Sequence, residues 1–161
     1  MKPKLTFLLA LTFLFLLGSS SVVFGDEIQD GFDAYKKKDY KEAVMFFHLS
    51  AEQGDALAQL LLGLMYDEGK GAAQDYVEAV KWYRRSAELG NASAQNNLGF
   101  MYAQGQGVLK DYVIAHMWFN LSFSNGSKNG LEGREMIEEK MSPPQIDKAQ
   151  EMARNWKPTT K

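Results

Sequence analysis

The 161-residue sequence contains no cysteine and only two histidines. The absence of cysteine excludes disulfide frameworks, thiolate zinc sites, cysteine nucleophiles and lipid attachment at an N-terminal cysteine. Two histidines offer little for metal coordination or general-base catalysis. We therefore expect a protein without a bound metal or cofactor.

A large excess of either charge is also missing. The chain has 18 lysine and arginine residues against 20 acidic residues, a formal net charge of -2. If Lys2 and Lys4 leave with an N-terminal leader, 16 basic residues remain against 20 acidic ones, which gives -4. A mildly acidic protein of this kind is not expected to bind nucleic acid or an anionic membrane surface.

Residues 1–25 have the layout of a secretory signal peptide. A basic start precedes an apolar run over residues 5–17, and a serine run and other small residues lead up to Gly25. Cleavage after Gly25 would leave 136 of the 161 residues, with no membrane insertion once the leader is removed. The alternative is an uncleaved anchor over residues 5–24, which are numerous enough to span a bilayer. Either way we expect an exported domain, in the periplasm or secreted if the source is a bacterium.

The rest of the chain repeats itself with a period of 36 residues. Five columns are identical in three copies, namely Asp39, Asp75 and Asp111; Tyr40, Tyr76 and Tyr112; Ala43, Ala79 and Ala115; Ser50, Ser86 and Ser122; and Gly54, Gly90 and Gly126. Two further columns are aromatic throughout, namely Phe46, Trp82 and Trp118, and then Phe47, Tyr83 and Phe119. The repetition predicts one structural unit used three times.

Each copy predicts two helices, here termed helix A and helix B. In the middle copy, small and apolar residues recur at helical spacing over Ala56–Glu68, and Gly69 and Gly71 follow as helix-ending and loop residues. Helix B is expected to start after the aspartate column, near residues 40, 76 and 112. In the first two copies the aspartate and a glutamate three residues later form a capping-box pattern, as Asp39 with Glu42 and Asp75 with Glu78. The glycines at 54, 90 and 126 are expected to end helix B.

A helical pair of this kind cannot bury its own apolar face, so the pairs must stack. We therefore predict an all-α fold, an α-solenoid of antiparallel helix pairs. Gly63 and Gly99 lie in the middle of helix A, where glycine weakens a helix, which indicates a close backbone crossing at both positions. Two further helices, expected at about 128–140 and 145–156, have a polar exposed face and are predicted to cap the solenoid.

The residues that carry a family resemblance are Ala58-Gln59-x-x-Leu62-Gly63-x-Met65-Tyr66-x-x-Gly69-x-Gly71, followed by Asp75-Tyr76-x-x-Ala79-x-x-Trp82-Tyr83-x-x-Ser86. This pattern resembles the Sel-one-like repeat, a relative of the tetratricopeptide repeat. The resemblance divides the chain into a tetratricopeptide-like hairpin at 26–55, Sel-one-like repeats at 56–91 and 92–127, and capping helices with a tail at 128–161.

The resemblance implies a non-enzymatic adaptor for a protein or peptide partner in envelope assembly, secretion, signalling or contact with a host. It also implies that helix A of each unit lines a concave surface, whose outward residues choose the ligand. These candidate partner-binding residues are Leu57, Leu60, Leu64 and Asp67 in one repeat and Ser93, Asn96, Phe100, Ala103 and Gln104 in the next. Ordinary packing against the adjacent unit is the alternative for the apolar members. We expect a monomer until the partner binds.

Catalytic motifs are missing from the sequence. It contains no His-Glu-x-x-His, Ser-x-x-Lys, Gly-x-Ser-x-Gly or phosphate-loop pattern, and His48 and His116 lie in columns that suit surface and packing positions. An enzyme acting on the cell wall or on β-lactams is the alternative, because cysteine-rich repeat proteins that resemble this family have been linked to penicillin binding. The lack of cysteine and of Ser-x-x-Lys disfavours it. A third possibility is a structural part that stacks on like units.

Overall fold

The computed structural model describes residues 27–158, which form eight α-helices and no strand. The helices are α2 (Glu27–Lys36), α3 (Tyr40–Glu52), α4 (Ala56–Glu68), α5 (Tyr76–Glu88), α6 (Ala92–Gln104), α7 (Tyr112–Ser124), α8 (Lys128–Glu138) and α9 (Pro143–Asn155). The predicted signal peptide lies outside the described residues. Within the described part, no helix is long and apolar enough to cross a membrane.

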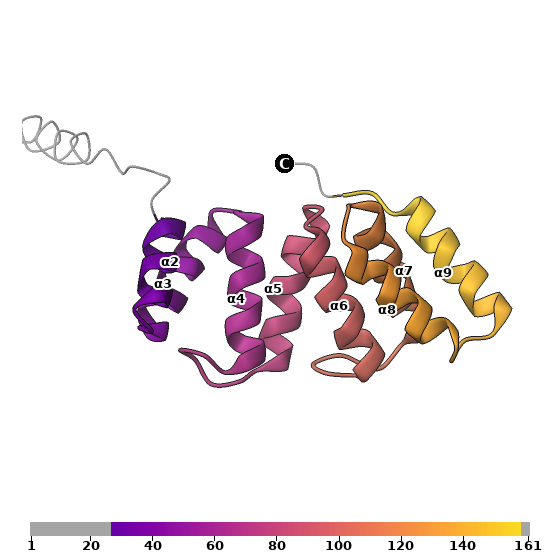
Figure 1. Cartoon of the computed structure of the whole chain (residues 1–161), viewed down its shortest axis with the longest axis horizontal. Coiled ribbons are helices and arrows are strands. Elements are labelled where there is room, and N and C mark those ends of the chain that lie inside the picture. Colours follow the sequence, from indigo (N-terminus) through magenta and orange to yellow (C-terminus); the bar gives the residue numbers. More distant parts are fainter. Residues whose placement is uncertain (1–26, 159–161) are drawn as a thin grey trace, which may run out of the picture.

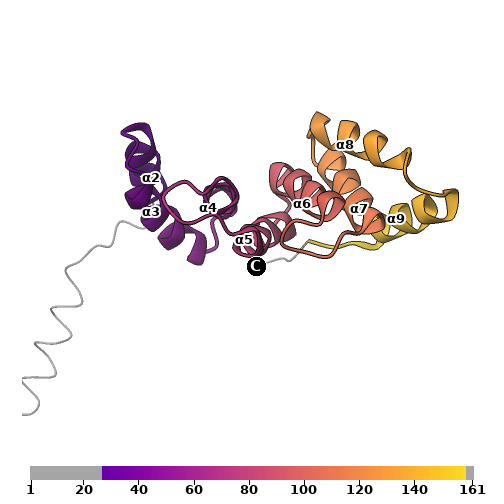
Figure 2. The same ribbon diagram turned by 90° about the horizontal axis from the view of Figure 1, so that it is seen from below.

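The helices stack in antiparallel pairs along one axis (Figure 1). Helix α2 packs on α3, α4 on α5 and α6 on α7, and each pair contacts the next through the adjoining helices. Figure 2 shows that the row bends into an arc, with α5 at its lowest point and α4, α6 and α8 facing its inner side. The predicted all-α solenoid is therefore confirmed.

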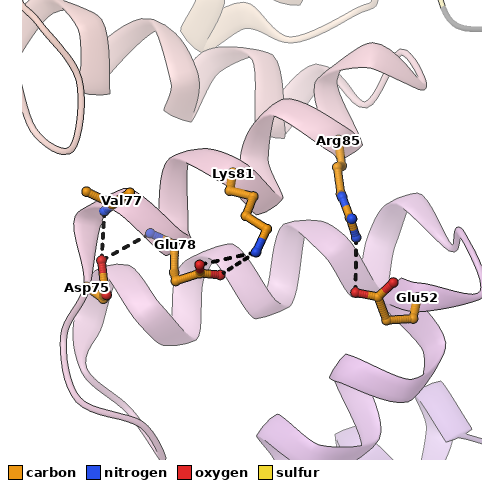
Figure 3. A network of polar contacts seen from close by, with 6 residues as sticks. All are labelled: Glu52, Asp75, Val77, Glu78, Lys81 and Arg85. Carbon is orange, nitrogen blue, oxygen red and sulfur yellow. Dashed lines mark hydrogen bonds and ion pairs between the residues drawn. The ribbon is translucent and has the colours of Figure 1, made fainter.

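The aspartate column caps helix B as predicted. The carboxylate of Asp75 accepts hydrogen bonds from the backbone amides of Val77 and Glu78, at 2.9 and 3.1 Å (Figure 3). The expected capping box is only half formed there, because the Glu78 carboxylate turns away and pairs with Lys81 at 3.1 Å. The first residue of α5 is Tyr76, as the repeat period predicts.

The mid-helix glycines make room for aromatic rings of helix B. A Cβ atom at Gly63 would lie 2.6 Å from the ring of Tyr83, and one at Gly99 would lie 2.6 Å from the ring of Phe119. The prediction of a close backbone crossing is therefore wrong at both glycines, because an aromatic ring of helix B, not a facing backbone, fills the space. Gly31 in the shorter first pair meets Phe47 in the same way, at 2.5 Å.

Close approach of two backbones occurs in the loops between helix A and helix B. Gly107 has a φ angle of 67°, and a Cβ there would lie 2.5 Å from the carbonyl carbon of Tyr76 at the start of α5. Gly71 packs in the same way on the backbone of Tyr40 at the start of α3. Each loop therefore rests on helix B of the preceding pair.

Buried polar side chains that recur with the repeat form hydrogen bonds from one helix to another. The side-chain amide of Gln95 donates a 3.0 Å hydrogen bond to the carbonyl of Ala87, and Gln59 repeats this bond one pair earlier, to Ala51. The hydroxyl of Ser122 donates a 2.7 Å hydrogen bond to the carbonyl of Ala92. These repeated polar residues are structural, since they satisfy carbonyl groups at helix ends.

The last two helices pack mainly on α7 rather than on one another. Figure 2 shows α7 between α8 and α9. On the α8 side, a Cβ at Gly133 would lie 2.5 Å from the ring of Phe119, so this ring is held between Gly99 and Gly133. On the α9 side, Trp156 packs edge-to-face against Trp118, with 5.8 Å between the ring centroids.

Candidate functional site

A groove on the inner side of the arc runs between α6 and α8. Its volume is about 300 Å³, and its lining comprises Asn96 and Phe100 from α6 and Asn129, Glu132, Gly133 and Met136 from α8. Gly133 in its lining has no side chain to fill the groove, and it lies close to the ring of Phe119. Two of the predicted partner-binding residues, Asn96 and Phe100, therefore lie together in one groove.

Asn96 is the unusual residue of this groove. Its side chain is 7% exposed, and its Oδ1 atom accepts no hydrogen bond within the described residues. One repeat earlier the equivalent residue is Leu60, which packs in the apolar core. A buried polar atom without a partner costs stability relative to an apolar side chain, so packing alone gives no reason for asparagine here.

Phe100 and Met136 give the groove an apolar lining. Phe100 is half-buried and packs edge-to-face on Phe119, with ring centroids 5.0 Å apart. Met136 is 42% exposed on the opposite helix. Among the lining residues Glu132 is the one with a charge, and it is exposed. The groove therefore combines an apolar floor, amide groups and one carboxylate, which suits a segment of polypeptide with apolar and basic side chains.

The structure corrects part of the predicted surface. Leu60 and Ala103 are 8% and 9% exposed and belong to the apolar core, so the prediction that they point outward is wrong. Leu64 is half-buried and packs against the same core. The reason is that α4 packs against α3 and α5, and α6 packs against α5, α7 and α8, which leaves only a narrow strip of helix A facing the inner side.

Asp67 has a structural partner. Its carboxylate accepts a 2.9 Å hydrogen bond from the hydroxyl of Tyr83. Burial, and after it the negative charge of Asp67, raises the pKa of that hydroxyl. The tyrosine therefore stays protonated and keeps donating, which fixes α4 against α5.

Leu57, Ser93 and Gln104 are exposed, but they do not line the groove. Asn129, Glu132 and Met136 do line it. They were missed because residues 128–138 lack the residue pattern of helix A and were assigned only to capping, although α8 begins 36 residues after α6. The available signal was Gly133, a glycine inside a predicted helix.

The two histidines lie in different surroundings. His48 is exposed and its ring packs edge-to-face on Trp82, 5.3 Å between centroids. His116 is fully buried, and its Nε2 lies 2.7 Å from Oε1 of Glu138. Residues 27–158 bring together no group of three or more histidines and carboxylates that could hold a metal ion.

The repeat pattern matches a known protein family along most of the chain. The model of the Sel1 repeat matches residues 14–55, 56–91 and 92–127, and the first of these matches begins within the predicted leader. No curated protein matches the chain.

Solved structures show the same fold. A protective antigen of uropathogenic Escherichia coli strains that displays an SLR fold is 33% identical, with a TM-score of 0.75 over 79% of this chain and 28% of the antigen. A Sel1 repeat protein from Oxalobacter formigenes is 27% identical, with a TM-score of 0.58 over 68% of this chain and 60% of that protein.

The cysteine rich protein B of Helicobacter pylori has a TM-score of 0.55 and is 22% identical over 56% of this chain and 68% of that protein, so it shares the fold alone. The chain thus spans less than two thirds of the length of the E. coli and Oxalobacter proteins.

Proposed function

Because the chain belongs to the Sel1 repeat family, whose members typically mediate protein–protein interactions, we propose that it is an exported, non-enzymatic scaffold that binds an extended peptide segment of a partner protein. The groove between α6 and α8 is the proposed binding site, and the buried Oδ1 atom of Asn96, which accepts no hydrogen bond within the described residues, is the observation that carries it. An extended peptide offers a backbone N–H for every residue, which supplies the missing donor for Asn96 Oδ1 once the amide turns toward the groove.

The groove also defines the chemistry of the segment. Phe100 and Met136 suit an apolar side chain of the peptide, and Glu132 favours a basic side chain nearby. The scaffold is monomeric until the partner binds in this proposal. An adaptor role in envelope assembly, secretion, signalling or host contact would follow from the identity of the partner.

Loss of the groove side chains should weaken binding. We expect the double variant Asn96→Ala and Phe100→Ala to bind the partner about tenfold more weakly, because a half-buried aromatic anchor and one hydrogen bond together contribute roughly 1.4 kcal/mol or more. The partner is first recovered from the cell envelope of the producing organism with the unaltered protein, and its affinity is then measured for each variant.

The matched control is the double variant His48→Ala and Lys81→Ala, since both residues are exposed on helix B of their pairs and away from the groove. Arg84 is unsuitable as a control, because its guanidinium donates to the hydroxyl of Tyr102 on α6. Normal binding by the groove variant, together with loss of binding in the control, would move the interface to the outer side of the arc.

Export predicts a defined N-terminus. If residues 1–25 are a signal peptide, protein recovered from the producing cell begins at Asp26 or within a residue or two of it, because small residues precede that position. The intact mass of the recovered protein measures this directly. A full-length product held in the membrane would instead identify residues 5–24 as an anchor.

A further inference from the structure

A second pocket lies at the other side of α8, where α7, α8 and α9 meet. Its volume is about 280 Å³, and its polar lining consists of Asn120, Ser124, Arg134, Gln150 and Arg154. It shares no residue with the groove between α6 and α8. Its lining comes from all three helices, and α8 and α9 pack on α7 from different sides (Figure 2).

Arg134 is held in place within this pocket by side chains behind it. Its Nη1 atom donates a 3.0 Å hydrogen bond to Oδ1 of Asn120, and its Nε lies 3.5 Å from Oε1 of Glu138. The guanidinium also lies 5.8 Å from the ring centroid of Phe123. The same Oε1 of Glu138 lies 2.7 Å from the buried His116, which anchors the carboxylate in turn. The guanidinium is therefore ordered before any ligand arrives, which lowers the entropy cost of binding.

Arg154 is the second cation of the pocket and has no partner. It is exposed, and within residues 27–158 it forms no hydrogen bond or ion pair. Arg134 and Arg154 together carry two positive charges, and the nearby Glu138, outside the lining, offsets one of them. The pocket thus keeps one net positive charge, with a whole guanidinium available to form paired hydrogen bonds to a carboxylate.

The remaining walls restrict the size and character of the ligand. Leu121 and Ala153 are apolar, while Ser124 and Gln150 add uncharged polar groups. The planar guanidinium groups favour an anion that presents two oxygens in one plane, as a carboxylate does. The volume suits a group about the size of one amino-acid residue.

We propose that the pocket between α7, α8 and α9 binds a carboxylate on a short apolar stem, with Arg154 as the principal contact and the preordered Arg134 as the second. A polypeptide offers this chemistry in two ways, at its C-terminus or on an acidic side chain. The site is separate from the groove and does not depend on the function proposed for it.

The test uses N-acetylleucine, which carries a terminal carboxylate, and N-acetylleucinamide, in which that carboxylate is replaced by a neutral amide. NMR titration of the purified protein follows the amide signals of Ser124, Gln150 and Arg154. We expect N-acetylleucine to shift these signals with a Kd on the order of 1 mM, the range open to so small a ligand, and the amide to bind at least tenfold more weakly. N-acetylglutamic acid α-amide carries a carboxylate on its side chain alone. Tighter binding of this compound than of N-acetylleucine would point to an acidic side chain, and weaker binding would point to a C-terminus.

Arg154→Gln should lower the affinity for N-acetylleucine about fivefold or more, because it removes a charge-assisted hydrogen-bonding group. Arg154 is exposed and unpartnered, so this variant is expected to fold normally. Lys148→Gln is the matched control, since it removes an exposed positive charge from the same helix at a residue outside the pocket. Equal binding of acid and amide, signal shifts away from the pocket, or an Arg154→Gln variant with unchanged affinity would each overturn the proposal.

Discussion

Replacing Gly107 with alanine should lower the free energy of unfolding by roughly 2 to 5 kcal/mol. Two costs add at this position. Its φ angle of 67° lies in the left-handed region, which residues other than glycine adopt only with strain. In addition, the new Cβ would lie 2.5 Å from the carbonyl carbon of Tyr76 and 2.9 Å from the amide nitrogen of Val77. Both atoms belong to the backbone of α5, so a change of side-chain rotamer cannot relieve the clash.

The neighbouring Gly105 provides a matched control for this experiment. Its φ angle of 75° imposes a similar strain, but the nearest atom to a new Cβ would be Cβ of Lys110, at 3.2 Å. We therefore expect Gly105→Ala to cost about 1 to 2 kcal/mol, the conformational part alone. Urea denaturation followed by far-ultraviolet circular dichroism measures both variants.

The difference between the two variants measures the contact between one repeat and the preceding one. Equal losses for Gly105→Ala and Gly107→Ala would mean that the loop can retreat from α5, and would contradict the close backbone contact. A larger loss at Gly107 would show that the loop contributes to the stacking of the pairs, as nearest-neighbour coupling in a solenoid requires.

The helices were the part of this fold that the sequence predicted best. The 36-residue columns fixed both ends of α4 and the starts of α3, α5 and α7, because caps and helix-ending glycines act through neighbouring residues in the chain. The role of Gly107 was only half predicted. Its place in a loop follows from Gly71, its equivalent 36 residues earlier, whereas its contact with Tyr76 depends on how two repeats stack.

The candidate site was predicted less completely, because it too depends on how the helical pairs stack. A repeat column shows that Leu60 and Asn96 are equivalent and chemically different, but the column does not show how much of each side chain neighbouring helices cover. Burial of Leu60 and Ala103 results from packing between pairs. Gly133 signals a close approach in α8, but it does not show that the side chain it meets is Phe119 of α7.

The second large effect is expected at Gly99, inside α6. Replacing it with valine should lower the free energy of unfolding by about 3 kcal/mol, at the upper end of the usual cost of overpacking. A Cβ at this position would lie 2.6 Å from the ring of Phe119. That ring cannot retreat, because Gly133 of α8 meets it as well, and a Cβ there would lie 2.5 Å away. The better helix propensity of valine recovers only a few tenths of a kcal/mol.

Gln104→Val is the matched control for Gly99→Val, because it places the same side chain at an exposed position of the same helix. We expect it to change the free energy of unfolding by no more than about 0.5 kcal/mol. Thermal and urea denaturation of both variants measure the difference. A neutral or stabilising Gly99→Val would mean that Phe119 has room to move. It would contradict the claim that Gly99 and Gly133 hold this ring in a narrow space between α6 and α8.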